Sequence, residues 1–136
     1  MYAADFDYVK ASSIEEAISI KGSNDDSSFL AGGHSLIPAM KLRLSTPQKL
    51  IDISGLDELK NIFKNGNYIS IGALCTHKQC AESEIIQSMC PALSDAASVI
   101  GDPHVRNKGT IGGALAHSDP QADYPGVVLA LNASFT

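Results

Sequence analysis

The sequence of 136 residues contains no tryptophan, and aromatic residues make up only 6% of it. Positive charge is also scarce, because ten lysines and arginines face fifteen aspartates and glutamates, which gives a formal net charge of -5. Such a chain does not offer the broad basic surface that binds the phosphate backbone of DNA or RNA. We therefore expect no nucleic-acid partner, and an anionic ligand needs local hydrogen-bond donors.

Long hydrophobic runs are absent as well. No stretch reaches the roughly 18 apolar residues that a membrane-spanning helix requires. The opening residues, MYAADFDYVK, lack the basic region and apolar core of a signal peptide. The sequence thus predicts a cytoplasmic protein without a membrane span. Because hydrophobic residues reach 44% and charged residues 18%, we expect a globular chain with a real core.

Metal-binding and hydrolase patterns are missing too. The spacing of Cys75, Cys80 and Cys90 fits neither a CxxC pair nor a zinc finger, and the four histidines form no HExxH motif. We expect no metal site, and we expect reduced cysteines in the core or in helices. The GxSxG motif of α/β-hydrolases is absent, so a catalytic triad has no support. We identify no catalytic residue.

The first third of the chain alternates strand and helix patterns. Strands are predicted at residues 5–9, 27–31 and 49–53, with one helix capped by Ser12 or Ser13 and a short helix capped by Ser35. The order strand, helix, strand, helix, strand is typical of a small α/β unit with parallel pairing.

From about residue 55 the pattern changes. Two short β-prone runs flank Asn65-Gly66, a strong signal for a two-residue hairpin. Helices are predicted after the capping pair Thr76 and Gln79 and over residues 91–100. The remaining segment is rich in turn residues and ends in the apolar run 127–131, which looks like the approach to a further strand. We expect a mainly antiparallel sheet with flanking helices.

Two glycine pairs are the candidate binding elements. AGGHS, residues 31–35, lies between a predicted strand and a predicted helix, where backbone amides can form an anion-binding nest. It lacks GK[ST] and the third glycine of GxGxxG, so the residues alone leave a tight turn and a phosphate nest both open. The second pair follows Thr110, and there Gly112 and Gly113 are expected to offer unobstructed amides. The two loops are expected to converge on one extended ligand.

Three stretches in this order, AGGHSLIPAMKLRL, LIDIS and IGDPHVRNKGTIGGALAHSDPQAD, resemble the FAD-binding medium subunit of molybdenum hydroxylases of the xanthine dehydrogenase and carbon monoxide dehydrogenase-like family. The opening FDYVKASSIEEAI is also similar, so the resemblance covers nearly the whole chain. It implies an α+β, PCMH-type FAD-binding fold with two α+β subdomains, here 1–54 and 55–136. The second subdomain is expected to be truncated at its C-terminus.

The resemblance also implies the cofactor contacts. The first loop would follow the adenine and pyrophosphate path, the second would form the opposing loop, Asp123 would lie near the flavin end, and Ile100 would pack on the cofactor. Position 114 is alanine where many relatives carry asparagine, so only its backbone role carries over. Valine at Gly33 or Gly112 is expected to weaken FAD binding in a folded domain. The implied contacts are Phe29, Leu30, Ala31, Gly32, Gly33, His34, Ser35, Leu36, Ile100, Thr110, Ile111, Gly112, Gly113, Ala114 and Asp123.

The function that the resemblance implies is electron transfer. A molybdopterin large subunit oxidises the substrate, an iron-sulfur small subunit carries the electrons, and FAD in this subunit passes them to an external acceptor. No acid-base residue is needed for this task. One alternative is a stand-alone PCMH-type FAD oxidoreductase, which needs its own substrate domain and proton donor. Another is a non-enzymatic nucleotide-binding module, which would bind a nucleotide without a reducible chromophore.

Overall fold

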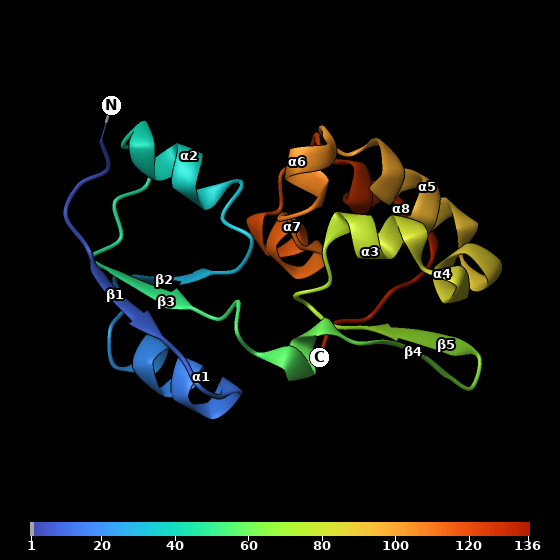
Figure 1. Cartoon of the computed structure of the whole chain (residues 1–136), viewed down its shortest axis with the longest axis horizontal. Helices are drawn as coiled ribbons and strands as arrows, with labels where there is room; N and C mark the ends of the chain where they lie inside the picture. The colour runs from blue at the N-terminus through green and yellow to red at the C-terminus, as the bar shows by residue number, and fades with distance from the viewer. Residues whose placement is uncertain (1) are drawn as a thin grey trace. The chain divides into compact units, whose positions relative to one another are not determined.

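A computed structural model describes residues 2–136. The chain forms two compact units that divide between Glu58 and Leu59, a few residues after the boundary expected between 54 and 55. Figure 1 colours the first unit from blue to green and the second from green to red. Mixed helix and strand content, with parallel pairing in the first unit and antiparallel pairing in the second, confirms the α+β fold class.

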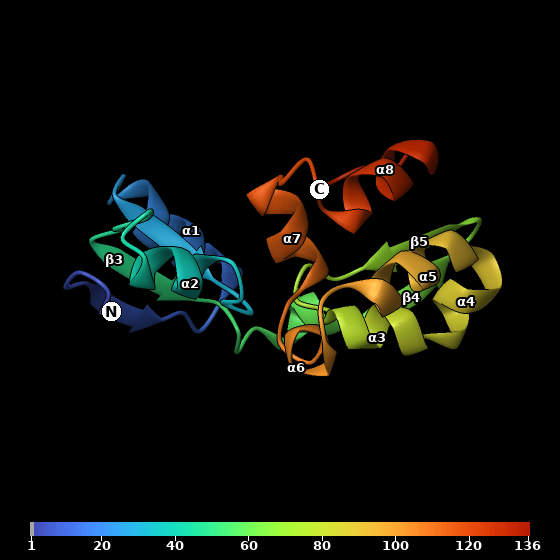
Figure 2. The ribbon, with the colours of Figure 1, turned by 90° about the horizontal axis from the view of Figure 1, so that it is seen from above.

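The first unit is the predicted three-stranded parallel sheet with two helices. The strand β3 lies between β1 and β2, so the chain crosses the sheet in one direction and then returns. Right-handed crossovers then place the two helices on opposite faces, as Figures 1 and 2 show. The elements are β1 (Asp7–Lys10), α1 (Ile14–Gly22), β2 (Ser27–Leu30), α2 (Leu36–Lys41) and β3 (Lys49–Asp52).

Helix α1 begins at a serine cap, as its sequence predicts. The Ser13 side chain accepts a hydrogen bond from the Glu16 backbone N–H, and the Glu16 carboxylate accepts from the backbone N–H and the hydroxyl of Ser12. The core side of the helix packs Ala17 against Ile51 of the central strand, which is fully buried. A cap and a small apolar residue therefore fix this helix on the sheet.

Asp52, the last residue of β3, is a buried charge of the first unit and is 8% exposed. The Tyr8 hydroxyl donates to its Oδ2, and the Ser54 backbone N–H donates to its Oδ1 at 2.8 Å. Burial acts to raise the pKa of Asp52, but these hydrogen bonds and the charge of Lys10 outweigh it and hold the pKa below its ordinary value. The carboxylate is therefore stabilised in its ionised form.

The second unit combines an antiparallel hairpin with a set of short helices. Its core cluster consists of Cys75, Cys80, Ile86, Leu93, Ala97, Ile111 and Tyr124, and α4 packs against the hairpin. The elements are the 3-10 helix η1 (Asp57–Lys60), β4 (Ile62–Asn65), β5 (Tyr68–Ile71), α3 (His77–Glu82), α4 (Glu84–Met89), α5 (Pro91–Val99), α6 (Pro103–Arg106), α7 (Ile111–His117) and α8 (Asp123–Ala130).

The hairpin and two helix ends follow the sequence prediction. Asn65 pairs with Tyr68, so the turn residues are Gly66 and Asn67, one position later than expected. Gly66 has φ +59, as the first turn residue of a type II′ hairpin requires. The capping box of Thr76 and Gln79 at the start of α3 is complete.

Two predictions for the end of the chain are wrong. The second glycine pair lies in the first turn of α7 rather than in an open loop, because the Thr110 hydroxyl caps that helix by accepting from the Gly113 N–H. Most of the run 127–131 lies in α8 rather than in the approach to a strand. Pro125 is tolerated in the first turn of α8, where no backbone N–H is needed, and Val127 packs against the core cluster.

The depressed pKa of Asp52 predicts how stability depends on acid. Asp52 binds a proton less readily in the folded chain, so its stabilising contribution is complete above the ordinary aspartate pKa and is lost as pH falls through the lower folded value. We expect Asp52→Asn to be less stable than wild type at neutral pH and to lose less stability on acidification. Urea unfolding over a pH series tests this, with exposed Asp25→Asn as the control. An acid dependence equal to that of wild type would contradict it.

Candidate functional site

The first glycine segment follows the carboxyl end of β2 directly. Gly33 has φ +75, and its carbonyl accepts from the Ile37 N–H at 2.9 Å, which starts α2. A left-handed residue at this point turns the chain from the strand into the helix. Ser35 is the cap residue of α2, but its hydroxyl makes no capping hydrogen bond, so the side-chain cap expected there is wrong.

The amides of this segment are unpaired. Within the described residues, the backbone N–H groups of positions 32 to 36 donate to no protein acceptor, and His34 and Ser35 are exposed. Successive amides beside a left-handed glycine form a concave donor surface for an anion. A hydrogen bond to a charged phosphate contributes about 1.5–3 kcal/mol, so a few of these donors suffice without a lysine. The segment fits a phosphate group.

The second glycine segment is different, because its amides are already used. Residues 109–112 pair with residues 73–77 around an antiparallel bridge between Thr76 and Thr110. The expectation of unobstructed amides is therefore wrong. The three bonds are Ile111 N–H to Cys75 O at 2.9 Å, Gly112 N–H to Ala73 O at 2.9 Å, and Gly113 N–H to Thr110 Oγ1 at 3.2 Å.

Gly112 is required by packing of the protein on itself. A Cβ at this position would lie 2.6 Å from both the carbonyl oxygen and the Cβ of Ala73. The space that a side chain would fill is thus already occupied by the neighbouring backbone. A valine here would strain the fold itself, so weaker FAD binding by that variant would not by itself identify a ligand contact.

The other implied contacts fall in both units. Phe29 and Leu30 belong to β2, and Phe29 is 42% exposed. Ile100 is the C-terminal cap residue of α5, and its carbonyl accepts from Arg106 Nη1 at 3.0 Å. Ala114 lies within α7, and Asp123 begins α8 with its side chain exposed. All of the implied contact residues are exposed or partly exposed, except Thr110 and Ile111, which are buried.

A buried polar pair was not found from the sequence. Nδ1 of His77 and the Tyr124 hydroxyl lie 3.0 Å apart, and both residues are nearly inaccessible. Burial raises the pKa of Tyr124, with Cys80 adding to the effect, and burial raises the pKa of Cys80 to about 12. Both groups therefore stay protonated. A histidine and a tyrosine so far apart in the chain carry no local pattern that predicts their contact.

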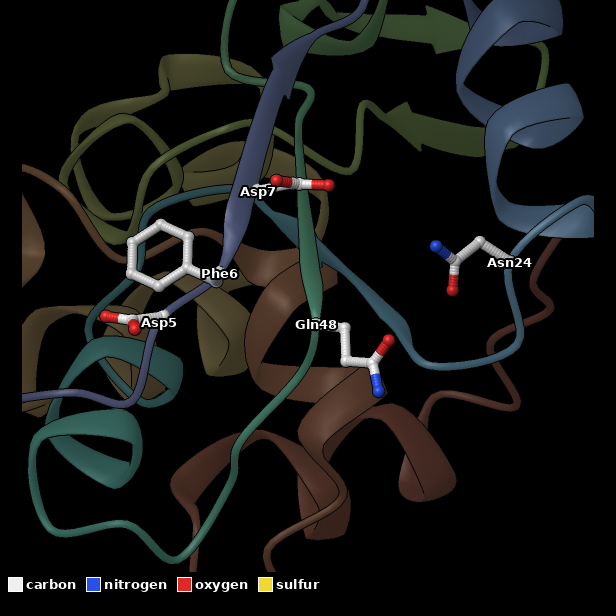
Figure 3. A pocket seen from close by; sticks show the side chains of 5 residues that line it. All are labelled: Asp5, Phe6, Asp7, Asn24 and Gln48. Carbon is white, nitrogen blue, oxygen red and sulfur yellow. The ribbon is translucent and has the colours of Figure 1, made fainter.

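A shallow hollow lies at the other end of the first sheet (Figure 3). It is lined by Asp5, Phe6, Asp7, Asn24 and Gln48, which lie just before or at the starts of the strands. Ligands of parallel α/β units bind at the carboxyl ends of the strands, where the first glycine segment lies. The hollow is therefore not part of the candidate site.

Residues 2–136 contain neither a cluster of metal ligands nor a helix that could cross a membrane. In this range no group of three or more histidine, cysteine, aspartate or glutamate side chains is arranged to hold a metal ion. No helix there combines the length and apolar character needed to cross a membrane.

Comparisons with known proteins agree on one family. The model of the FAD binding domain in molybdopterin dehydrogenase matches residues 4–136. The glyceraldehyde dehydrogenase medium chain of Sulfolobus acidocaldarius is 44% identical over 134 residues, which are 98% of this chain and 48% of that protein. The carbon monoxide dehydrogenase medium chain of Hydrogenophaga pseudoflava is 44% identical over 131 residues, 96% of this chain and 46% of that protein.

A solved structure shares the fold. Carbon monoxide dehydrogenase from Hydrogenophaga pseudoflava, in a form that lacks the Mo-pyranopterin moiety of its cofactor, contains a chain that matches with a TM-score of 0.93 at 44% identity. The match covers 96% of this chain and 46% of that chain. The present chain thus spans about half the length of the relatives it matches.

The packing of Gly112 predicts a loss of stability on substitution. We expect Gly112→Ala to lower the free energy of unfolding by about 1–3 kcal/mol, because the Cβ overlaps the Ala73 backbone. Gly126→Ala is the matched control, since Gly126 lies in α8 and its Cβ would meet open space. That variant is expected to gain about 0.5–1 kcal/mol. Equal effects in urea unfolding would contradict this account.

Proposed function

Because the chain belongs to the family of FAD-binding domains in molybdopterin dehydrogenases, we propose that it is the FAD-binding part of an electron-transfer subunit in a molybdenum hydroxylase. FAD is the cofactor of this family. The observation that carries the proposal is the row of unpaired amides after β2. It supplies donors for the cofactor's pyrophosphate on a chain that is acidic overall.

In this proposal the first glycine segment holds the phosphates. The amides of residues 32 to 36 donate to the phosphate oxygens, and Gly33 provides the left-handed conformation that points them to one side. Phe29 and Leu30, at the end of β2, offer apolar surface beside the segment. Bound FAD supplies the redox chemistry, and the protein binds and orients it.

The second glycine segment contributes a rigid surface rather than a nest of free amides. Its backbone bonds to Ala73 and Cys75 hold Thr110 to Ala114 in one conformation. The exposed carboxylate of Asp123 accepts hydrogen bonds and repels phosphate, so we assign it to a hydroxyl or ring N–H of the cofactor. Ile100 adds apolar contact surface.

The partners follow from the same proposal. The relatives are named as medium chains of dehydrogenases, which supports a subunit that works beside others. We assign the iron-sulfur clusters to a small subunit and the molybdopterin site to a large subunit, with electrons passing through FAD to an external acceptor. Cys75 and Cys80 are free and lie in the core of this chain, so they serve packing and not cluster binding.

The first test of this function is the absorption spectrum of the purified full-length protein. We expect a flavin spectrum that bleaches on reduction with dithionite. If flavin is lost in purification, refolding with excess FAD should restore the spectrum. A protein that acquires no flavin under these conditions would overturn the proposed function. Copurification with an iron-sulfur subunit and a molybdopterin subunit would separate it from a stand-alone flavoenzyme.

A second test distinguishes a direct effect of the first glycine segment on FAD binding from the backbone strain that any substitution at a positive φ causes. Gly33 and Gly66 both have positive φ, at +75 and +59, so alanine at either position should cost about 1–2 kcal/mol of stability. At Gly33 the added Cβ also lies 2.7 Å from the end of the flexible Ile37 side chain, which must shift, whereas at Gly66 it meets open space. Only Gly33 lies in the proposed nest, because Gly66 is a turn residue of the hairpin. We expect Gly33→Ala to bind FAD about tenfold more weakly, the loss of roughly one charged hydrogen bond, and Gly66→Ala to bind like wild type. Titration of the cofactor-free protein measures both, and equal affinities would exclude the nest.

A further inference from the structure

The His77–Tyr124 pair lies between the two parts of the second unit that the proposed function assigns to FAD. His77 is the first residue of α3, and its backbone N–H donates to the Gly109 carbonyl at 3.0 Å. Its ring packs directly on Gly109, since a Cβ there would lie 2.6 Å from Nε2. Gly109 immediately precedes Thr110, which caps α7.

The other partner is joined to the second part. Tyr124 follows Asp123 in the first turn of α8 and is 1% exposed. Its hydroxyl lies 3.0 Å from His77 Nδ1, and the two rings are 5.4 Å apart at 55°. Figures 1 and 2 show α3, α7 and α8 as separate helices of this unit. The pair joins α3 to α8, which are far apart in the chain, whereas α7 and α8 follow one another directly.

We propose that the His77–Tyr124 hydrogen bond is a positioning contact that fixes the Thr110–Ala114 segment and Asp123 relative to each other for cofactor binding. The proposal rests on the proposed function for its ligand. Tyr124 is the residue after Asp123, and His77 packs on Gly109, the residue before Thr110. Both side chains are buried, so neither can touch FAD itself. Their effect on the cofactor must therefore pass through the segments that they hold.

A matched control is available in the same unit. The Ser94 hydroxyl is also buried and donates to the Ala81 carbonyl at 2.8 Å, within the packing of α5. Tyr124→Phe and Ser94→Ala each remove one buried hydroxyl. Phenylalanine keeps the ring, so Tyr124→Phe removes the hydroxyl's interactions with His77 and Cys80 and little packing. The His77 variants then test the contact with His77 by itself. Ser94 contacts neither candidate segment through that bond.

The first readout needs no cofactor. In cofactor-free full-length protein, the amides of Ile111 and Gly112 are protected from hydrogen exchange by their bonds to Cys75 and Ala73. We expect Tyr124→Phe to speed their exchange about tenfold, as loss of one buried hydrogen bond implies, and Ser94→Ala to leave it unchanged.

The second readout is FAD affinity, measured at a temperature where every variant is folded. We expect Tyr124→Phe to bind FAD about fivefold to tenfold more weakly and Ser94→Ala to bind like wild type. His77→Asn keeps a polar atom near the position of Nδ1 and should retain more affinity than His77→Leu. This rescue would not occur if the residue only filled space.

The outcomes separate the two proposals. If wild type binds FAD while Tyr124→Phe changes neither exchange nor affinity, or changes them as Ser94→Ala does, the positioning proposal is overturned and the proposed function stands. If wild type acquires no FAD, the proposed function is overturned, and the role of the pair in cofactor binding with it. Faster exchange of Ile111 and Gly112 in Tyr124→Phe together with weaker FAD binding supports both.

Discussion

The second unit depends on one short stretch of backbone pairing. The bonds around the Thr76–Thr110 bridge join residues more than thirty positions apart. They hold the first residues of α3 beside the first residues of α7. They also require glycine at position 112, because the paired backbones leave no room for a Cβ. The core cluster, including Ile111 and Cys75, is built directly on this pairing.

The two glycine pairs look alike in sequence but serve different physical ends. Gly33 is needed for a left-handed turn that leaves the following amides unpaired, whereas Gly112 is needed for close contact with Ala73 inside a helix turn whose amides are bonded. The first segment therefore leaves hydrogen-bond donors unused, and the second uses its donors to hold its own backbone in place.

Local signals in the sequence predicted the fold where the cause is local. The Thr76–Gln79 capping box, the Ser13 cap and the alternation of the first unit all depend on residues within a few positions of one another, and all are confirmed. The helix at residues 111–117 was missed because two glycines disfavour a helix intrinsically, and its stability comes from the Thr110 cap and from pairing with residues 73–77. Likewise, the apolar run 127–131 suggested the approach to a strand, but most of it lies in α8, where Val127 packs against the core cluster. The family of the candidate site was predictable from motif order, and the AGGHS amides were recognised as candidate donors. The bonds of Ile111 and Gly112 to residues 73–75 were not predictable, because hydrogen-bond partners across the chain have no sequence signature.

The burial of Cys75 and Cys80, on either side of the α3 cap residue Thr76, has a chemical consequence. The thiolate is the form of cysteine that oxidants and alkylating reagents attack, and it is disfavoured at both positions because both thiols are fully buried and their pKa values are raised. The folded chain therefore shields these two sulfurs from oxidation to sulfenic acid, while half-buried Cys90 lies closer to solvent. The protection of both sulfurs thus depends on the packing of the second unit around them.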